Sequence, residues 1–300
     1  MYEPIVNALQ LHFEQPDKEP RRIFHGRGHM FDGLQHINID WYPPVVLITA
    51  YEPIENLDEI VTLLNKFDAH QQTRSIVYQQ RSSKGATSTC VWGEEMPSVV
   101  VVENGVRYKV QPGVHQNAGL FLDMRPLRAW LKSYSAGKTV LNLFAYTCSF
   151  SVAALAGDAR LVVSVDMSKP SINWGRKNHE LNGHDPRCVR SMPYNILKSW
   201  ARIEKPGPYD TVVIDPPTRQ RGSFDVERDY VAVLKRLRRF CRKGTDVFAT
   251  INSPYLGSDY LPNLMQRYQP TYRLLGEFPA SDEFVDRFPE KALKIYHFKS

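Results

Sequence analysis

Three short apolar runs, each ending in a turn or an acidic residue, constrain this chain most. They read VLNLFAYTCS from position 140, VVSVDMS from 162 and TVVIDPP from 211. Continuous apolar runs of this length are typical of strands that are buried on both faces. Segments with helical character follow each of them. This alternation predicts a doubly wound, mostly parallel α/β sheet, whose strand carboxyl ends would form a ligand-binding edge.

The alternation extends from about residue 114 to the end of the chain. Its expected helices cover residues 120–135, 149–157, 170–183, 194–204, 224–244 and 259–268, and Gly244 is expected to end the fifth of them. Its expected strands cover residues 139–145, 160–167, 187–193, 210–217, 245–254, 272–280 and 292–300. We therefore expect residues 114–300 to form one α/β domain.

The segment before residue 114 has a different pattern. Strand-like runs occupy 45–52, 74–81 and 97–113, and a helix is expected over 55–67. Asn104-Gly105 is a type I′ hairpin signal. The first forty residues read as a Gly-punctuated loop and a short strand, closed by Pro43-Pro44. We expect residues 1–113 to form a small α+β module with antiparallel pairing, a candidate RNA-binding or substrate module.

Bulk composition narrows the class of protein. The chain has 300 residues, 42% of them hydrophobic, and a net charge of +6, which mildly favours a polyanionic partner. Many enzymes are equally basic, so the net charge alone does not identify a nucleic-acid partner. No apolar run approaches the roughly 20 residues of a membrane span, and the first residues do not read as a signal peptide. The four cysteines are widely separated without a Cys-x-x-Cys pair, so we expect reduced thiols and a cytoplasmic location.

The first turn, from Asn142 to Ser149, contains no glycine. Small residues and hydroxyls occupy it instead, and the start of the next helix offers backbone N–H groups to an anion. A simple buried strand and turn would read the same way. The missing G-x-G-x-x-G argues against a classical dinucleotide site.

Two further polar residues follow strands of the alternation. Asp166 ends the second strand about twenty residues on, where a carboxylate can accept both ribose hydroxyls. The alternative is a helix N-cap or a surface ion pair. Asn195 follows the third strand and could bind an adenine amine, or cap the helix expected at 194–204.

Asp215-Pro216-Pro217-Thr218 is the sharpest motif. Two prolines after a buried strand fix an extended, rigid turn that could hold a flat acceptor base. Asn252 and Ser253 end the next strand, on the other side of the expected cleft. A simple Asx-turn is the alternative for Asn252.

Together these residues resemble a family, the bacterial 23S rRNA methyltransferases of the large-subunit K/L and I type, which use S-adenosylmethionine (SAM). The matching stretches are NAGLFLDMR (117–125), LNLFAYT (141–147), VDMS (165–168), KNHELNG (177–183), IDPPT (214–218) and FDVERDY (224–230). The cytosine-C5 branch places a nucleophilic cysteine after the fifth strand, where this chain has Asn252-Ser253. The resemblance therefore favours the guanine-N7 branch. The first 40 residues do not match the PUA-like domain of the C5 branch.

The resemblance implies a set of site residues. The expected SAM-binding residues are Phe121, Asp123, Arg125, Asn142, Phe144, Ala145, Tyr146, Thr147, Asp166, Met167, Ser168, Asn195 and Asp215. The expected catalytic residues are Asp215, Pro216, Pro217 and Asn252. Apart from the resemblance, the basic loop after Asp-Pro-Pro and the basic stretch near the amino terminus give Arg219, Arg221 and Arg27 as expected RNA contacts, and no metal is expected. The basic cluster at 235–243 is read mainly as a solvated helix face.

Two other functions fit these residues. One is methyl transfer to a small molecule or a protein amide, since Asp-Pro-Pro turns also suit planar amides. The other is a non-catalytic RNA-binding factor that kept the fold. The sequence indicates neither the target nucleotide nor the oligomeric state.

Overall fold

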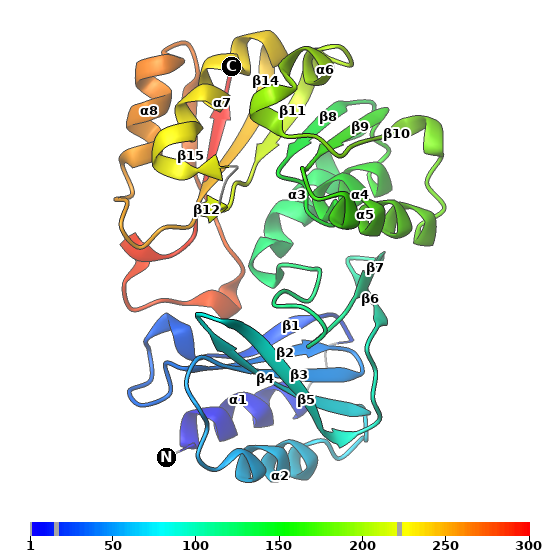
Figure 1. The fold of residues 1–300 in the computed structure, drawn as a ribbon, viewed down its shortest axis with the longest axis vertical. Coiled ribbons are helices and arrows are strands. Elements are labelled where there is room, and N and C mark those ends of the chain that lie inside the picture. The colour runs from blue at the N-terminus through cyan, green and yellow to red at the C-terminus, as the bar shows by residue number, and fades with distance from the viewer. Residues whose placement is uncertain (1, 15–17, 221–223) are drawn as a thin grey trace. The chain divides into compact units, whose positions relative to one another are not determined.

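The computed structural model describes residues 2–14, 18–220 and 224–300, which form two compact units (Figure 1). The first unit comprises Met1–Asp123 and Ser281–Pro289, and the second comprises Met124–Ala280 and Glu290–Ser300. This division differs from the expected boundary after residue 113. The first unit extends ten residues further and takes up a segment from near the carboxyl terminus.

The segment 281–289 belongs to the first unit because its side chains bind there. Glu283 lies 3.5 Å from the guanidinium of Arg21, and Arg287 lies 3.0 Å from the carboxylate of Asp32. The guanidinium of Arg22 stands 4.5 Å from the ring centroid of Phe284. No local sequence pattern reports such distant pairings.

The first unit is built on a five-stranded sheet in the order β1-β2-β3-β4-β5. Its strands are β1 (Arg21–His25), β2 (Ile37–Tyr42), β3 (Val45–Ala50), β4 (Ser75–Ser82) and β5 (Gly85–Gly93). The expectation of antiparallel pairing is incomplete, because β3 and β4 are parallel and are joined through helix α2 (Leu57–Phe67). A parallel pair needs such a crossover, whereas a tight turn suffices for antiparallel neighbours.

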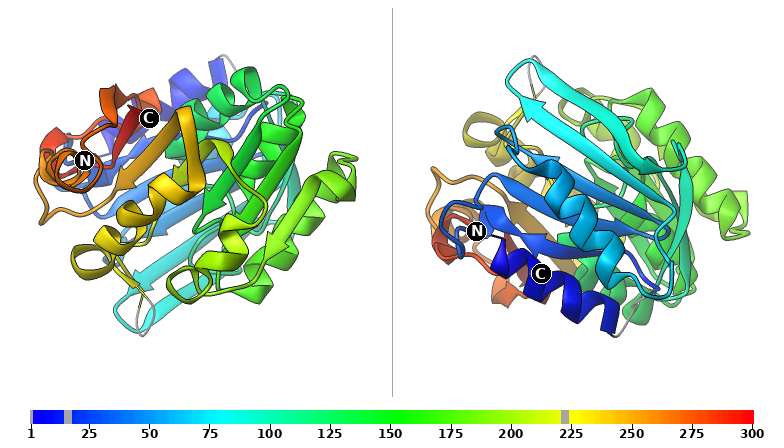
Figure 2. Two further views of the ribbon diagram at one scale, coloured as in Figure 1. Left: turned by 90° about the horizontal axis from the view of Figure 1, so that it is seen from above. Right: turned by 90° about the horizontal axis from the view of Figure 1, so that it is seen from below.

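Helix α1 (Glu3–Glu14) was not expected from the sequence. Its buried residues include Ile5, Leu9 and Phe13, which recur every four positions and share one core with Ile60 and Leu64 of α2. Figure 2 (right) shows α1 and α2 across the same face of the sheet. The sequence prediction missed this helix.

The hairpin prediction is confirmed. Strands β6 (Val99–Glu103) and β7 (Val106–Val110) pair antiparallel around Asn104 and Gly105. Both turn residues have positive φ, 51° and 74°, as a type I′ turn requires.

The second unit carries a seven-stranded sheet in the order β10-β9-β8-β11-β14-β16-β15. Its strands are β8 (Thr139–Leu143), β9 (Leu161–Val165), β10 (Val189–Met192), β11 (Tyr209–Ile214), β14 (Cys241–Ile251), β15 (Arg273–Phe278) and β16 (Lys294–Lys299). The first five strands in this order are parallel to one another, and β16 runs antiparallel to both β14 and β15. The predicted doubly wound, mostly parallel sheet is confirmed.

Alternate residues of the central strands face opposite helical layers. Val140 of β8 packs with α3 (Arg125–Tyr134) and α4 (Ser149–Ala156). The next residue, Leu141, packs with α6 (Trp200–Glu204), α7 (Val226–Phe240) and α8 (Tyr260–Tyr268). Helix α5 (Lys169–Leu181) follows β9. Burial on both faces explains why the strands read as unbroken apolar runs.

Two helix predictions were partly wrong: one helix ends earlier than expected, and the other is interrupted in its middle. The helix expected over 224–244 ends at Phe240, because Cys241 already pairs in β14. Gly244, at φ 85°, lies inside that strand, where the register to β11 shifts by a bulge. The helix expected over 194–204 is interrupted at Ser199, which separates a short 3-10 turn (Ile196–Lys198) from α6.

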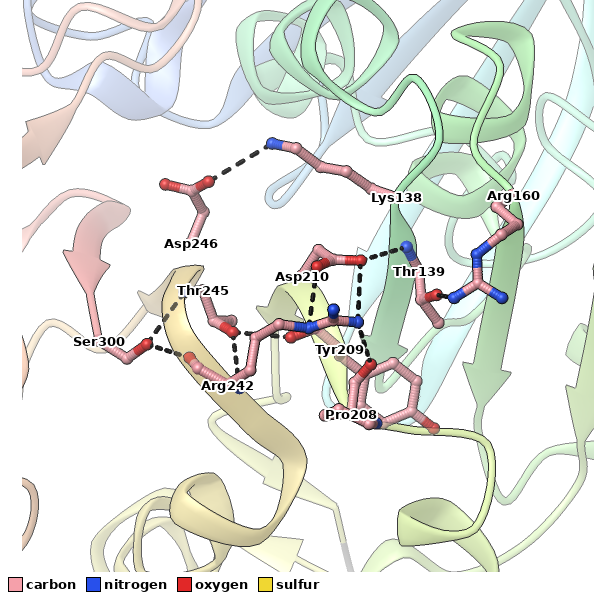
Figure 3. A network of polar contacts seen from close by, with 10 residues as sticks. All are labelled: Lys138, Thr139, Arg160, Pro208, Tyr209, Asp210, Arg242, Thr245, Asp246 and Ser300. Atoms are coloured by element: carbon pink, nitrogen blue, oxygen red, sulfur yellow. Dashed lines mark hydrogen bonds and ion pairs between the residues drawn. The ribbon is translucent and has the colours of Figure 1, made fainter.

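Polar contacts close the amino-terminal edge of this sheet (Figure 3). The carboxylate of Asp210 accepts the backbone N–H of Thr139 at 2.8 Å and lies 3.1 Å from Arg242. The hydroxyl of Thr245 donates to the carbonyl of Tyr209 at 2.7 Å. The protein's own polar groups thus bind one another at this edge.

Part of the basic cluster of α7 is paired. Arg239 lies 2.8 Å from Glu204 and Arg236 lies 3.9 Å from the same carboxylate. Within the described ranges, no helix is long and apolar enough to cross a membrane.

Candidate active site at the carboxyl edge of the parallel sheet

The two motif carboxylates leave the sheet at one edge. Leu143 of β8 pairs in register with Val165 of β9 on one side and with Ile214 of β11 on the other. Asp166 and Asp215 each follow directly. Because one strand separates them, ordinary strand spacing puts their backbones about 10 Å apart. The residues that the sequence singled out thus gather where ligands bind in open α/β sheets.

The turn after β8 adopts an unusual backbone without any glycine. Phe144, Tyr146 and Cys148 all have left-handed conformations, with φ of 60°, 47° and 62°. Each such residue costs about 1 kcal/mol. The backbone N–H of Ala145 donates to the carbonyl of Val165 at 3.0 Å, and that of Cys148 donates to Ala145 at 2.7 Å. Strain of this kind concentrates at functional sites.

Asp166 is held by this turn and by the start of α5. Its Oδ2 accepts the N–H of Tyr146 at 2.9 Å, and its Oδ1 accepts the N–H of Ser168 at 2.8 Å. Burial raises the pKa of Asp166, although these two hydrogen bonds act to lower it. A carboxylate has about four acceptor positions, so its oriented oxygens can also accept the two hydroxyls of a ribose.

Buried polar residues of β8, α4, β9 and α5 stabilise the turn after β8. The amide of Asn142 is fully buried and donates to Ser151 at 3.1 Å, and the hydroxyl of Ser151 lies 2.6 Å from that of Ser164. Asn178 donates to the carbonyl of Thr147 at 3.0 Å. The side chains of Asn142 and Thr147 are both buried, and these contacts hold the backbone of the turn in place.

Asp215 is oriented by the neighbouring strand. The hydroxyl of Thr250 donates to its Oδ1 at 2.5 Å. The backbone carbonyl of Thr250 in turn accepts the hydroxyl of Tyr230 at 3.0 Å. Burial, together with the charge of Asp215, raises the pKa of Tyr230 well above its usual range, so it stays a neutral donor.

The turn after β8 and the segment after Asp-Pro-Pro also meet. The rings of Phe144 and Phe224 pack edge to face with centroids 4.8 Å apart. The hydroxyl of Thr218 donates to the carbonyl of Asn252, which joins the ends of β11 and β14. The sequence prediction missed Thr250, Tyr230 and Phe224. Only the parallel register of β11 and β14, with Ile214 opposite Ala249, places Thr250 next to Asp215, and no local sequence pattern gives that register.

The remaining predicted residues of this unit differ in exposure. Ala145 and Pro216 are buried, whereas Pro217 and Asn252 are exposed and Met167 is 44% exposed. Ser168 caps α5 by accepting the N–H of Ser171. The side chain of Asn195 makes no capping hydrogen bond. This removes the alternative explanation that the sequence offered for it.

The last predicted residues are divided between the two units, and two of them contact other side chains. Phe121 and Asp123 belong to the first unit, and Arg125 begins α3 in the second. Arg219 lies 3.6 Å from Asp225, its partner in the short antiparallel pair of β12 (Arg219–Gln220) and β13 (Phe224–Asp225). The guanidinium of Arg27 stands 4.5 Å from the ring centroid of Tyr51. Arg221 lies outside the described residues.

The cysteines near the second unit's core are poor nucleophiles. Burial raises the pKa of the Cys148 thiol to about 12 and that of Cys241 to about 11. The reactive form of a cysteine is the thiolate, and at neutral pH neither thiol supplies it.

Comparison with known proteins bears on this geometry. The model of the S-adenosylmethionine-dependent methyltransferase family matches residues 21–299. The ribosomal RNA large subunit methyltransferase K/L of Hahella chejuensis is 31% identical over 224 residues, which cover 69% of this chain. The match spans only 30% of that relative's length.

Solved structures share the fold. SMU.776, a methyltransferase complexed with SAH, superimposes with a TM-score of 0.86 at 24% identity and covers 99% of this chain and 81% of its own. Trm5b from Pyrococcus abyssi has a TM-score of 0.64 at 15% identity and covers 87% of this chain and 74% of its own. With the strand order above, these likenesses identify a class I methyltransferase fold. A family match over nearly the whole length, on a sheet whose carboxyl edge gathers Asp166 and Asp215, makes this chain a member of the SAM-dependent methyltransferases.

Proposed function

We propose that the protein transfers the methyl group of SAM to a base of RNA, with 23S rRNA as the substrate and guanine N7 favoured over cytosine C5. The observation that carries the proposal is the Asp215-Pro216-Pro217 corner beside Asp166 at one sheet edge. The similarity to a large-subunit ribosomal RNA methyltransferase supports the choice of RNA. We expect the enzyme to act in the cytoplasm.

The proposal assigns described residues to each part of SAM. Asp166, already aligned by two backbone N–H groups, would accept the ribose hydroxyls. The backbone of the strained turn at 144–148 would approach the amino-acid part of the cofactor. Met167 and Asn195, which follow β9 and β10, would flank the adenine. Arg125, at the start of α3 in the same unit, remains a further candidate, and for Phe121 and Asp123 of the first unit the family resemblance alone supports a role.

The chemistry asks little of the protein beyond alignment. SAM supplies an electrophilic methyl carbon on a sulfonium. The in-plane lone pair of the base nitrogen would form the new N–C bond as the C–S bond breaks, and the electron pair of that bond would stay on sulfur. Guanine N7 carries no proton, so no general base is required. Asp215, Asn252 and the rigid proline corner would hold the base in line with the methyl group.

The cysteine chemistry favours nitrogen over carbon as the acceptor. Attack on cytosine C6 needs a thiolate. The position after the fifth parallel strand carries Asn252, and burial keeps Cys148 and Cys241 protonated, because their thiol pKa values lie at about 12 and 11.

The test uses methyl-labelled SAM and three acceptors: rRNA from a strain lacking the protein, total protein and total small metabolites. Label in rRNA alone, recovered as 7-methylguanosine by nucleoside mass spectrometry, is the expected result. Label in protein or metabolites would favour the alternative substrates. No micromolar SAM binding by calorimetry would favour a non-catalytic RNA-binding factor. Label in 5-methylcytidine would reject the nitrogen acceptor.

A further inference from the structure

A groove runs along the outer edge of the parallel sheet in the second unit. Its volume is about 640 Å³, and all four residues of the edge strand β10 line it. Helix α5 lines one side, and the end of α6 lines the other. Figure 1 shows β10 at the margin of the sheet. None of the residues of the turn at 144–148, nor Asp166 or Asp215, lines this groove.

The groove gathers positive charge from separate elements. Arg176 comes from α5, Arg190 from β10, Arg202 from α6 and Lys205 from the residue after α6. All four are exposed, and none lies within ion-pair distance of a carboxylate in the described parts of the chain. Glu180 is the one acidic residue among those that line it. Four cations against one anion favour a polyanionic occupant.

An aromatic ring and a buried imidazole complete the lining. The guanidinium of Arg202 stands 4.6 Å from the ring centroid of Tyr194, which is itself 37% exposed. His179 is 3% exposed, and its Nδ1 lies 2.9 Å from Nδ1 of His184. Its Nε2 has no hydrogen-bond partner among the described residues. Burial and the neighbouring His184 lower the pKa of His179 to about 3, so the positive charge comes from arginine and lysine.

We propose that this groove binds the phosphodiester backbone of the substrate RNA, next to the methyl-transfer site. The inference rests on the proposed function for the identity of the polyanion. Arg and Lys contacts to phosphates give sequence-independent affinity, and an exposed tyrosine offers a face for an unpaired base. A neutral adenine would not need four cations, so the groove is not simply the cofactor pocket.

The groove lies beside the predicted adenine site. Tyr194 lines the groove just beyond the carboxyl end of β10. The next residue in the sequence is Asn195, the predicted adenine contact. An RNA strand in the groove would therefore pass close to the bound cofactor. Arg176 and Lys205 would hold phosphates from the two flanking helical segments.

The test measures binding of a labelled single-stranded 23S rRNA fragment by fluorescence anisotropy as salt is varied. We expect the Arg190→Gln/Arg202→Gln variant to lower the slope of log K against log salt by about 1.4, and to weaken binding roughly twentyfold at 0.1 M salt. Arg176→Gln/Lys205→Gln should act in the same direction. SAM affinity by calorimetry should stay unchanged, which shows that the variants fold.

A matched control removes the same charge elsewhere. Arg238→Gln/Lys243→Gln takes two exposed cations from the end of α7 and the start of β14. This variant should keep the wild-type salt slope.

Equal slopes for wild type and both groove variants would overturn the proposal, even if the enzyme methylates RNA. Binding of pyrophosphate without an effect on RNA would also overturn it, by marking a free-phosphate site. A wild-type enzyme that binds RNA through the groove but methylates only other substrates would reject the proposed function alone.

Discussion

Asp215 is a carboxylate whose direction is set by another strand. Its Oδ1 accepts the hydroxyl of Thr250, and the backbone of Thr250 is fixed by Tyr230. Two prolines follow it, so neither its backbone nor its side chain has much freedom. A group aligned this well is suited to hold an acceptor in position.

We expect Asp215→Ala to reduce kcat for methyl transfer by at least about 100-fold, because the acceptor loses its alignment with the methyl group. The Kd for SAM, measured by calorimetry, should change by less than about threefold. Asp185→Ala, which removes an exposed carboxylate near the start of β10, serves as the control and should keep full activity. A fully active Asp215→Ala enzyme would remove Asp215 from the active site.

Thr250 is a positioning residue in this scheme. Thr250→Val removes the hydrogen bond to Asp215 with little change of volume, and such a bond to a charged group is worth about 2 kcal/mol. We expect kcat to fall roughly 30-fold with KM for RNA affected less. Thr250→Ser should recover most of the rate, because it keeps the hydroxyl. If valine and serine variants behaved alike, the hydroxyl would have no part in positioning.

Among individual residues, the sequence indicated that two carboxylates follow buried strands, but it did not indicate which residues hydrogen-bond to them. Asp166 and Asp215 were predictable because an acidic residue directly after a buried strand is visible in the chain itself. Thr250 was not, since its role depends on the register between β11 and β14. Asn142 is predicted to bind SAM, and its side chain is buried against Ser151 of α4, a contact that no local pattern encodes.

Among the elements, the turn after β8 and helix α5 depend on each other. A Cβ atom at Gly175 would lie 2.2 Å from Sγ of Cys148 and 2.8 Å from its Cβ. The helix can approach the strained turn only because position 175 has no side chain. This contact holds the backbone that Asp166 bonds to.

We therefore expect Gly175→Ala to lower the free energy of unfolding by about 2 kcal/mol through overpacking, and to weaken SAM binding by displacing the turn. Chemical denaturation and calorimetry measure the two effects. Adding Cys148→Ala should recover part of both, since the closest clash is with the sulfur. Lys177→Ala, on the exposed side of α5, is the control. An unchanged Gly175→Ala variant would show that α5 can move without cost.

Element types were easier to predict than their ends. Strands buried on both faces stand out as apolar runs, so the α/β alternation was readable. The end of α7 was misplaced because Gly244 resembles a helix terminator, whereas it sits at a bulge of β14. Helix α1 was overlooked although its buried positions Ile5, Leu9 and Phe13 recur every four residues, which is a helical spacing.

For the whole molecule, pH stability depends on a carboxylate at the amino edge of the sheet. Asp246 is 6% exposed and accepts Lys299 at 2.7 Å and His297 at 3.0 Å, with Lys138 at 3.5 Å. Burial acts to raise its pKa, but these hydrogen bonds and charges outweigh burial and lower the pKa to about 2.

A carboxylate with a lowered pKa stabilises the fold above its unfolded pKa of about 4, and this contribution is lost as the pH falls toward 2. We expect Asp246→Asn to cost roughly 2 kcal/mol at pH 7, measured by urea unfolding. The difference from wild type should shrink as the pH falls from 5 to 3. A difference that stays constant over this range would mean that the cost arises from packing.

The chain passes between the two units three times, after residues 123, 280 and 289. A gene fragment that stops at codon 123 would omit Phe284 and Glu283, which cover Arg22 and Arg21 of the smaller unit. Such a fragment would be an incomplete fold. A single gene fusion after codon 123 could therefore not add or exchange the smaller unit. Homologues that lack this unit would also need a different segment in place of residues 281–289.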